Sequence, residues 1–394
     1  MIRLHRILLP ALGLGLGLLA TSETRADGYT VRDLGTLTGA GQSSYADGIN
    51  ASGQVVGASS YGTSGYYHAV VFNTNGTITD IGTLGGPGSY ANGINNAGQV
   101  VGQGDLANFQ GSNAFLYDAG TSKLTGLGTL PLNGAFSSSN ANAINNAGTI
   151  VGDSNTSQPG IGHAARFVPG GTNVDLGPAT TPANGGLSSV VYAVNSLGVA
   201  GGAAFQQGVP ARHAALFSNG QVTYIGNLGT APTNSSIIYG LNDAGQAVGY
   251  GQINFSTNHA FSYKAGSGLT DLGTLGGNDP RLSSYAYAIN TAGTIVGSSQ
   301  YATGVFGSHA FVEVGGVMID LNSLVVGKSP FVTLNDAFAI NDSGQIVGDG
   351  TLADGTQHGF VLTLSAVPEP STFVLLGLGL GLISLVRRPG RRAR

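Results

Sequence analysis

The sequence contains no cysteine and no tryptophan among its 394 residues, and only 9% of its residues are charged. Without cysteine the chain can form neither disulfide bonds nor thiolate metal sites, and it has no cysteine nucleophile. The GxSxG, HExxH and P-loop motifs of common enzyme classes are also missing. The sequence therefore predicts no metal and no cofactor, and it gives little sign of an enzyme.

Basic residues are scarce in the body of the chain, between Asp27 and Ala366. That region holds seven basic and 17 acidic residues, which gives a net charge of −10. An acidic surface repels phosphate backbones, so we expect no nucleic-acid partner.

Residues 1–26 are typical of a secretory signal peptide. Arg3 and Arg6 precede an apolar stretch from Ile7 to Ala20, and small residues at Thr24 and Ala26 suit a cleavage site. A membrane anchor, the alternative, needs a longer apolar run.

The other end of the chain, residues 367–394, has three parts. Val367-Pro368-Glu369-Pro370 precedes an apolar run from Phe373 to Val386, and five arginines follow among the last eight residues. As a helix this run measures about 21 Å, against about 30 Å for a hydrocarbon core. Arginine side chains that snorkel to the interface can supply part of the difference. We expect a C-terminal transmembrane helix with its basic end in the cytoplasm.

These three parts closely resemble the PEP-CTERM sorting signal of Gram-negative bacteria that make exopolysaccharide. The resemblance implies export across the inner membrane and transient retention there. It also implies processing by an exosortase near Pro368–Pro370, followed by release or attachment at the cell surface. A plain C-terminal anchor is the alternative.

Between the two ends, one short sequence motif occurs seven times: a small apolar residue, Asn, two variable residues, Gly, and a β-branched run that ends in Gly. Successive asparagines lie 45 to 51 residues apart. A repeat of this length is typical of solenoids and propellers. The asparagines are Asn50, Asn95, Asn145, Asn195, Asn242, Asn290 and Asn341.

One repeat predicts four short strands. In the second repeat these are Tyr90–Ile94, Gln99–Gly102, Asn113–Tyr117 and Lys123–Leu127, with a tight turn at Asn95–Gly98. Four strands in about 48 residues is the size of a propeller blade.

The ends of the array favour a closed ring. The seventh repeat lacks a fourth strand, whereas a spare strand, Tyr29 to Leu34, precedes the first repeat. The spare strand can complete the last blade and leave no long free edge. We therefore predict an all-β fold over residues 27–366: a seven-bladed β-propeller of four-stranded blades closed by the N-terminal strand. An open solenoid, the alternative, needs capping repeats that the sequence lacks.

Two sequence motifs resemble the HAF family of extracellular repeats. One lies in the third strand, as in His259-Ala260-Phe261 and His309-Ala310-Phe311, and the other is the run Asp271 to Gly277. The resemblance covers nearly all of residues 29 to 364. It implies export and a repeat architecture, and it carries no assigned chemistry.

Histidine and aspartate recur at fixed places in most repeats. Each repeat offers one equivalent histidine, whereas a metal site needs several that converge. We predict that the histidines bond a local backbone group or pack beside an aromatic ring, and that the aspartates accept bonds from the glycine-rich turn that follows. The histidines are His68, His163, His213, His259, His309 and His358, and the aspartates are Asp33, Asp80, Asp175, Asp271 and Asp320.

The best candidates for a binding face are loop residues outside the repeat, because no scaffold role explains them. Long loops between the second and third strands place aromatic side chains around one mouth of the ring. Aromatic rings with Asn, Gln and Ser suit sugars, although each ring can also pack within its own loop. The candidates are Tyr61, Tyr67, Phe109, Phe205, Arg212, Phe255, Tyr301 and Phe306.

Carboxylates give the only hint of catalysis. Asp349 and Asp354 form a possible pair for glycoside cleavage or for Ca²⁺, but aspartate in glycine-rich loops usually stabilises turns. Asp279 with Arg281 is equally ambiguous.

Three functions remain open at this point. The first is an exported, non-enzymatic propeller that binds a partner such as extracellular polysaccharide at the cell surface or in the matrix. The second is a polysaccharide-active hydrolase or lyase, and the third is a purely structural matrix protein.

Overall fold

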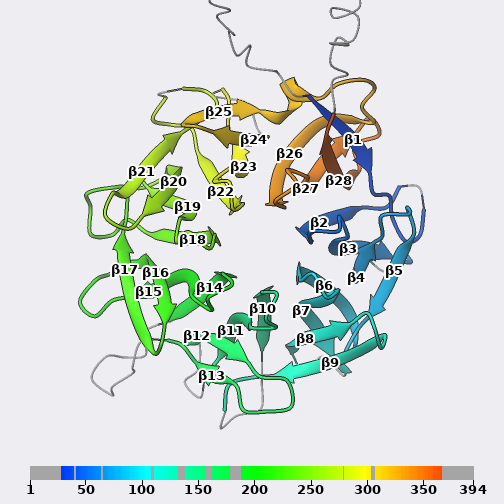
Figure 1. The fold of residues 1–394 in the computed structure, drawn as a ribbon, viewed down its shortest axis with the longest axis horizontal. Helices are drawn as coiled ribbons and strands as arrows, with labels where there is room; N and C mark the ends of the chain where they lie inside the picture. Colours follow the sequence, from blue (N-terminus) through cyan, green and yellow to red (C-terminus); the bar gives the residue numbers. More distant parts are fainter. Residues whose placement is uncertain are drawn as a thin grey trace, which may run out of the picture.

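The computed structural model describes residues 28–39, 41–63, 65–107, 111–131, 138–156, 161–177, 188–277, 279–302 and 307–365. Over this part of the chain, seven four-stranded antiparallel sheets surround a central channel like the blades of a propeller (Figure 1). The predicted all-β, seven-bladed propeller is confirmed. The signal peptide, residues 1–26, and the sorting region, residues 367–394, lie outside the described residues.

Each blade runs outward from the channel in the order of its strands. The innermost strands are β2 (Ser44–Ile49), β6 (Gly85–Ile94), β10 (Ser139–Ile144), β14 (Ser189–Val194), β18 (Ser236–Leu241), β22 (Ser284–Ile289) and β26 (Phe331–Ile340). The second strands are β3 (Val55–Tyr61), β7 (Gln99–Leu106), β11 (Ile150–Asn155), β15 (Ala200–Phe205), β19 (Ala247–Gln252), β23 (Ile295–Ser299) and β27 (Ile346–Leu352).

The third strands are β4 (Tyr66–Phe72), β8 (Ser112–Asp118), β12 (Gly162–Phe167), β16 (Arg212–Ser218), β20 (Asn258–Lys264), β24 (His309–Val314) and β28 (Gln357–Leu364). The outermost strands are β5 (Ile78–Gly82), β9 (Lys123–Gly128), β13 (Val174–Asp175), β17 (Gln221–Gly226), β21 (Gly268–Gly273), β25 (Val317–Asp320) and β1 (Tyr29–Asp33). A 3₁₀ helix, Leu321–Leu324, follows β25.

The N-terminal strand closes the ring, as the sequence predicts. β1 pairs antiparallel with β28, and Tyr29 lies opposite Leu364 (Figure 1). The backbone amide of Ser365 also donates to the carbonyl of Gly28 at 2.8 Å. The first and last described segments of the chain therefore hold one blade together.

A β-bulge interrupts every innermost strand at the same place. In blade one, Asp47 is the extra residue, because the pairing of β2 with β3 shifts between Ala46 and Gly48. The same shift occurs in the other six blades. A bulge bends its strand and re-aims a side chain.

The bulge explains the glycine that ends the β-branched run of each repeat. A Cβ atom on Gly57 would lie 2.0 Å from the carbonyl oxygen of Tyr45, and equivalent glycines meet equivalent carbonyls at 1.8 to 1.9 Å. No side chain fits there. These glycines are Gly57, Gly102, Gly152, Gly202, Gly249, Gly297 and Gly348.

The hydrophobic core lies between the blades in seven clusters. Fully buried phenylalanines of the third strands, such as Phe115, Phe261 and Phe360, face valines and alanines of the neighbouring blade. Truncation of such a ring to alanine typically costs about 3–5 kcal/mol.

Buried serines add polar links between neighbouring blades. Ser89 Oγ accepts a hydrogen bond from the amide of Ala69 in the preceding blade and donates to the carbonyl of Gly82. Equivalent serines accept from a third strand at five further junctions. Between blades six and seven, the side chain of Asn322 instead bonds both backbone groups of Leu334.

Candidate functional site: the central channel

The repeated asparagines form a closed ring of hydrogen bonds at one end of the channel, which we call the Asn face. The Nδ2 of each asparagine donates to the backbone carbonyl of the next, at 2.9 to 3.4 Å. The last bond, from Asn341 to Asn50, joins residues 291 positions apart. This ring is a structural closure of the propeller.

Each asparagine also builds its own turn. Asn50 Oδ1 accepts hydrogen bonds from the amides of Ser52 and Gln54. Gly53, which completes the turn, has φ +80°, a conformation that glycine adopts without strain. Because the seven asparagines are only 3 to 7% exposed, these bonds satisfy groups that water does not reach.

Above the Asn face, alternate residues of the innermost strands line the channel in three rings, one residue from each blade. The aliphatic ring lies next to the asparagines and separates a cavity of about 250 Å³ at the Asn face from one of about 280 Å³ beyond it. It consists of Ile49, Ile94, Ile144, Val194, Leu241, Ile289 and Ile340.

The seven bulge residues form the second ring, which we call the bulge ring. They line the larger cavity, and they differ from blade to blade although the sequence around them repeats. They are Asp47, Asn92, Asn142, Tyr192, Tyr239, Tyr287 and Phe338. Blades one to three therefore contribute polar groups and blades four to seven contribute aromatic rings.

The aromatic half of the bulge ring is continuous. Tyr239 contacts Tyr192 and Tyr287, with ring centroids 4.9 and 5.6 Å apart, and Tyr287 contacts Phe338 at 5.1 Å. Edge-on and tilted contacts at these distances stabilise aromatic pairs. Burial raises the pKa values of Tyr239 and Tyr287, so both phenols stay protonated at neutral pH.

The polar half of the bulge ring is a hydrogen-bonded network of amides. Asn92 donates to Asn140 Oδ1 at 2.8 Å, and Asn140 donates to Asn142 Oδ1 at the same distance. Asn142 in turn donates to Asp153 Oδ1 at 3.1 Å. Burial raises the pKa of Asp153, whereas the bond from Asn142 and the positive charge of Arg212 act against that shift.

The third ring, which we call the mouth ring, opens away from the Asn face. It consists of Tyr45, Tyr90, Asn140, Val190, Ile237, Tyr285 and Asp336. Tyr67 of β4 packs between Tyr45 and Tyr90, with centroids 5.5 and 5.9 Å away. Burial and the neighbouring Tyr67 raise the pKa of Tyr45 to about 12.

Where blade seven meets blade one, the carboxylate of Asp349 lies within electrostatic reach of Asp336 and Asp47. Asp336 and Asp349 are direct partners in the pairing of β26 with β27, a placement that is unfavourable for two like charges. Burial, followed by the charges of Asp336 and Asp47, raises the pKa of Asp349 to about 7. The pKa of Asp47 also rises to about 7, because protein atoms crowd its side chain even though it keeps some exposure to the channel.

Two of the loop residues predicted as a binding face lie near the mouth ring. Tyr67 belongs to the tyrosine cluster above, and Arg212 lies over the ring of Phe205, 5.5 Å from its centroid, within electrostatic reach of Asp153. Tyr61 and Tyr301 instead stack on His68 and His309 at 3.8 and 4.0 Å.

The remaining loop candidates do not join them. Phe255 is 95% exposed, and Phe109 and Phe306 lie outside the described residues. The sorting residues Val367, Pro368, Glu369 and Pro370 also lie outside the described residues. Sequence reasoning missed the bulge ring, although one signal marks it: the residue three positions before each repeated asparagine varies while its neighbours repeat.

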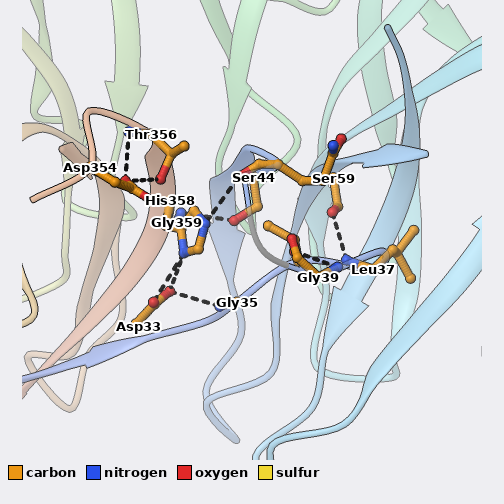
Figure 2. A network of polar contacts seen from close by, with 12 residues as sticks. Asp33, Gly35, Leu37, Gly39, Ser44, Ser59, Asp354, Thr356, His358 and Gly359 are labelled. Carbon is orange, nitrogen blue, oxygen red and sulfur yellow. Dashed lines mark hydrogen bonds and ion pairs between the residues drawn. The ribbon is translucent and has the colours of Figure 1, made fainter. Parts of the chain in front are cut away.

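The recurring histidine and aspartate bond each other, which the sequence did not predict. His358 Nδ1 contacts both carboxylate oxygens of Asp33 at 2.9 and 3.0 Å, and Asp33 also accepts the amide of Gly35, the predicted turn bond (Figure 2). Equivalent pairs occur in four other blades. His213 lacks an aspartate partner and contacts the amide of Asn227 at 3.3 Å.

The other candidate carboxylates have separate roles. Asp354 accepts hydrogen bonds from the amide and hydroxyl of Thr356 (Figure 2). These bonds lower its pKa. Asp349 lies on β27 and faces Asp336, so the expected pairing of Asp349 with Asp354 is replaced by a pairing with Asp336. Asp279 forms an exposed ion pair with Arg281 at 2.8 Å.

Within the described residues, no three histidine, aspartate or glutamate side chains are grouped as metal ligands. In the same part of the chain no helix is long and apolar enough to cross a bilayer. The predicted transmembrane run, Phe373 to Val386, lies outside that part.

Comparison with known proteins identifies one segment by sequence. Residues 366–392 match the PEP-CTERM protein-sorting motif, which confirms the sorting signal predicted for this end of the chain. The motif implies export, transient anchoring through the C-terminal region and processing by an exosortase. No curated protein sequence matches the chain. The resemblance of the repeats to the HAF family stays a prediction.

Solved structures with a similar fold are distant in sequence. The β-propeller domain of the Trilobed protease from Pyrococcus furiosus is 11% identical, with a TM-score of 0.49 over 83% of this chain and 97% of that domain. TolB from Acinetobacter baumannii is 12% identical, with a TM-score of 0.32 over 79% of this chain and 64% of that one. Trypanosoma rangeli sialidase in complex with the inhibitor DANA is 12% identical, with a TM-score of 0.36 over 79% and 59%.

Proposed function

We propose that this exported propeller binds a segment of extracellular polysaccharide at the end of its channel that lies away from the Asn face, and catalyses no reaction on it. The observation that carries the proposal is the two-sided bulge ring, with four aromatic residues on one side and amides and a carboxylate on the other. Aromatic faces pack against the C–H faces of sugar rings, and amide and carboxylate groups bond the hydroxyls. A cavity of about 280 Å³ lies between these two sides.

The sorting signal supports a binding site at the end of the channel away from the Asn face. The last described strand, β28, ends at the Asn face, because Leu364 lies against Gly344 of the asparagine turn in blade seven. The chain continues from there toward the sorting motif. We propose that the apolar run Phe373 to Val386 anchors the protein transiently in the inner membrane. The Asn face is then turned toward the bilayer, and the mouth ring faces away from it.

The test is binding of the host exopolysaccharide to the full chain, purified in detergent. Tyr239→Leu removes an aromatic side chain from the middle of the aromatic half of the bulge ring, and we expect this variant to bind at least tenfold more weakly. Phe255→Ala, on an exposed loop, is the matched control and should leave the affinity unchanged. A thermal unfolding transition like that of the unsubstituted protein shows that each variant keeps the fold. If Phe255→Ala abolishes binding and Tyr239→Leu does not, the loops are the site and the proposal fails.

A polysaccharide-active hydrolase is the second candidate, and one observation favours it. Asp336 and Asp349 face each other on paired strands, and burial raises the pKa values of both. A carboxyl group with a raised pKa and a neighbouring carboxylate can serve as acid and base in glycoside cleavage. Release of reducing ends from the host polysaccharide, lost in Asp336→Asn, would establish this activity. If the chain neither binds nor cleaves the polysaccharide, a purely structural role in the matrix remains.

A further inference from the structure

The lining of the channel is acidic on one side and has no basic group to balance that charge. The side chain of Asp47 lines the cavity and makes no hydrogen bond among the described residues, and its charge reaches Asp349, the strand partner of Asp336. No lysine, arginine or histidine lines either cavity of the channel within the described residues. Arg212, near the mouth ring, acts on Asp153 on the far side of the channel.

An uncompensated group of carboxylates in a narrow channel is expensive for the fold. Two like charges placed opposite each other on paired strands destabilise the sheet. A buried carboxylate without a partner also loses its hydration. A ligand that brings a positive charge would relieve both costs, whereas a neutral ligand would relieve neither.

The aromatic half of the bulge ring lies directly beside these carboxylates. Phe338 occupies the position next to Asp47 around the ring, and the contacts Phe338–Tyr287 and Tyr287–Tyr239 extend the aromatic surface at 5.1 and 5.6 Å. The charges of Asp336 and Asp349 also reach Tyr287. Aromatic faces attract cations, most strongly where water is excluded.

We infer that the channel recognises a sugar that carries a protonated primary amine, with the amine between Asp47 and the aromatic half of the bulge ring. This inference rests on the proposed function, because it names the class of sugar that the same site takes. The sugar ring stacks on the tyrosines, the amine donates hydrogen bonds to Asp47, and the amides of Asn92 and Asn142 face the hydroxyls on the opposite side.

The test compares three oligosaccharides of equal length for binding to the full chain at pH 7 by calorimetry. One is built of glucosamine, the second of N-acetylglucosamine and the third of glucose. We expect the glucosamine oligomer to bind at least about tenfold more tightly than the two neutral ones. That preference should weaken as the salt concentration rises, because charge attraction is screened.

Two variants keep the test decisive. Asp47→Asn should remove the preference, so that the three oligosaccharides bind about equally, and the fold should tolerate it because blades two and three carry asparagine at the equivalent position. Asp354→Asn, in an exposed turn, should change nothing.

Equal affinity for all three sugars, or a preference that survives in Asp47→Asn, overturns the inference and leaves the proposed function standing. If neither the oligosaccharides nor the host polysaccharide binds, both the inference and the proposed function fail.

Discussion

The asparagine ring and the bulge ring lie one above the other in the same channel and follow opposite rules. The asparagine positions are identical in all seven blades, and the polar groups of each side chain have partners. The bulge positions hold aspartate, asparagine, tyrosine and phenylalanine, and Asp47 has no partner among the described residues. Where a repeat is constant, its residues build the ring. Where it varies, its residues line the cavity that we propose as the binding site.

The largest loss of stability should come from the substitution of a glycine that lies opposite a bulge. A Cβ atom on Gly102 meets the carbonyl of Tyr90 at 1.9 Å, so Gly102→Ala must displace the bulge and should cost about 3 kcal/mol or more. Gly76→Ala is the control, with φ +85° and open space around it, and should cost about 1–2 kcal/mol. Urea unfolding of both variants measures the difference. Equal losses would show that the bulge is not rigid.

The second-largest loss of stability should come from a substitution in the asparagine ring. Asn145→Ala removes a buried bond to the carbonyl of Asn195 and partly buried bonds from the amides of Ala147 and Thr149, and should cost about 2–3 kcal/mol. Asn96→Ala, in an equivalent turn but at an exposed position, should cost less than about 1 kcal/mol. Unfolding curves for both proteins decide the point. Comparable losses would mean that the ring adds nothing beyond turn formation.

Removal of the buried carboxylate of Asp349, on the second strand of blade seven, should stabilise the fold at high pH. Asp349 is 5% exposed and its pKa is raised to about 7, so folding favours the protonated form and stability falls as the pH rises from about 4 to about 7. Asp349→Ser, which copies Ser298 of blade six, should gain on the order of 2–4 kcal/mol at pH 8 and little at pH 4. A destabilised variant at pH 8 would contradict this account of the charge.

The smallest effects should lie at the outer edge of the blades. His259→Asn breaks the pair with Asp271 and should cost about 1 kcal/mol, since blade two folds with Asn113 at the same place. Asp279→Asn, in an exposed ion pair, should leave the melting temperature unchanged. A large loss in Asp279→Asn would show that this loop is part of the folded core.

The repeat made most of the fold predictable, because the asparagine turn, the strand spacing and the spare strand at Tyr29 are local signals. Partners that lie far apart in the chain were not predictable. The pairing of His358 with Asp33 appears only when the ring closes. The pairing of Asp336 with Asp349 depends on the register of the β26–β27 hairpin, which bulges shift at three places. Sequence reasoning placed the binding face in the loops because loops vary, but Asp47 and Tyr239 vary within a strand. Their exposure to the channel comes from a bulge, which the sequence marks by a glycine on the neighbouring strand and by the variation of the bulge residue itself.

The most direct test of the account is hydrogen exchange of backbone amides with and without bound host exopolysaccharide. The account predicts new protection in residues 190–194, 237–241, 285–289 and 336–340, which carry the aromatic half of the bulge ring. Protection confined to the loops at 58–67, 203–212 and 298–308, with the channel strands unchanged, would contradict it.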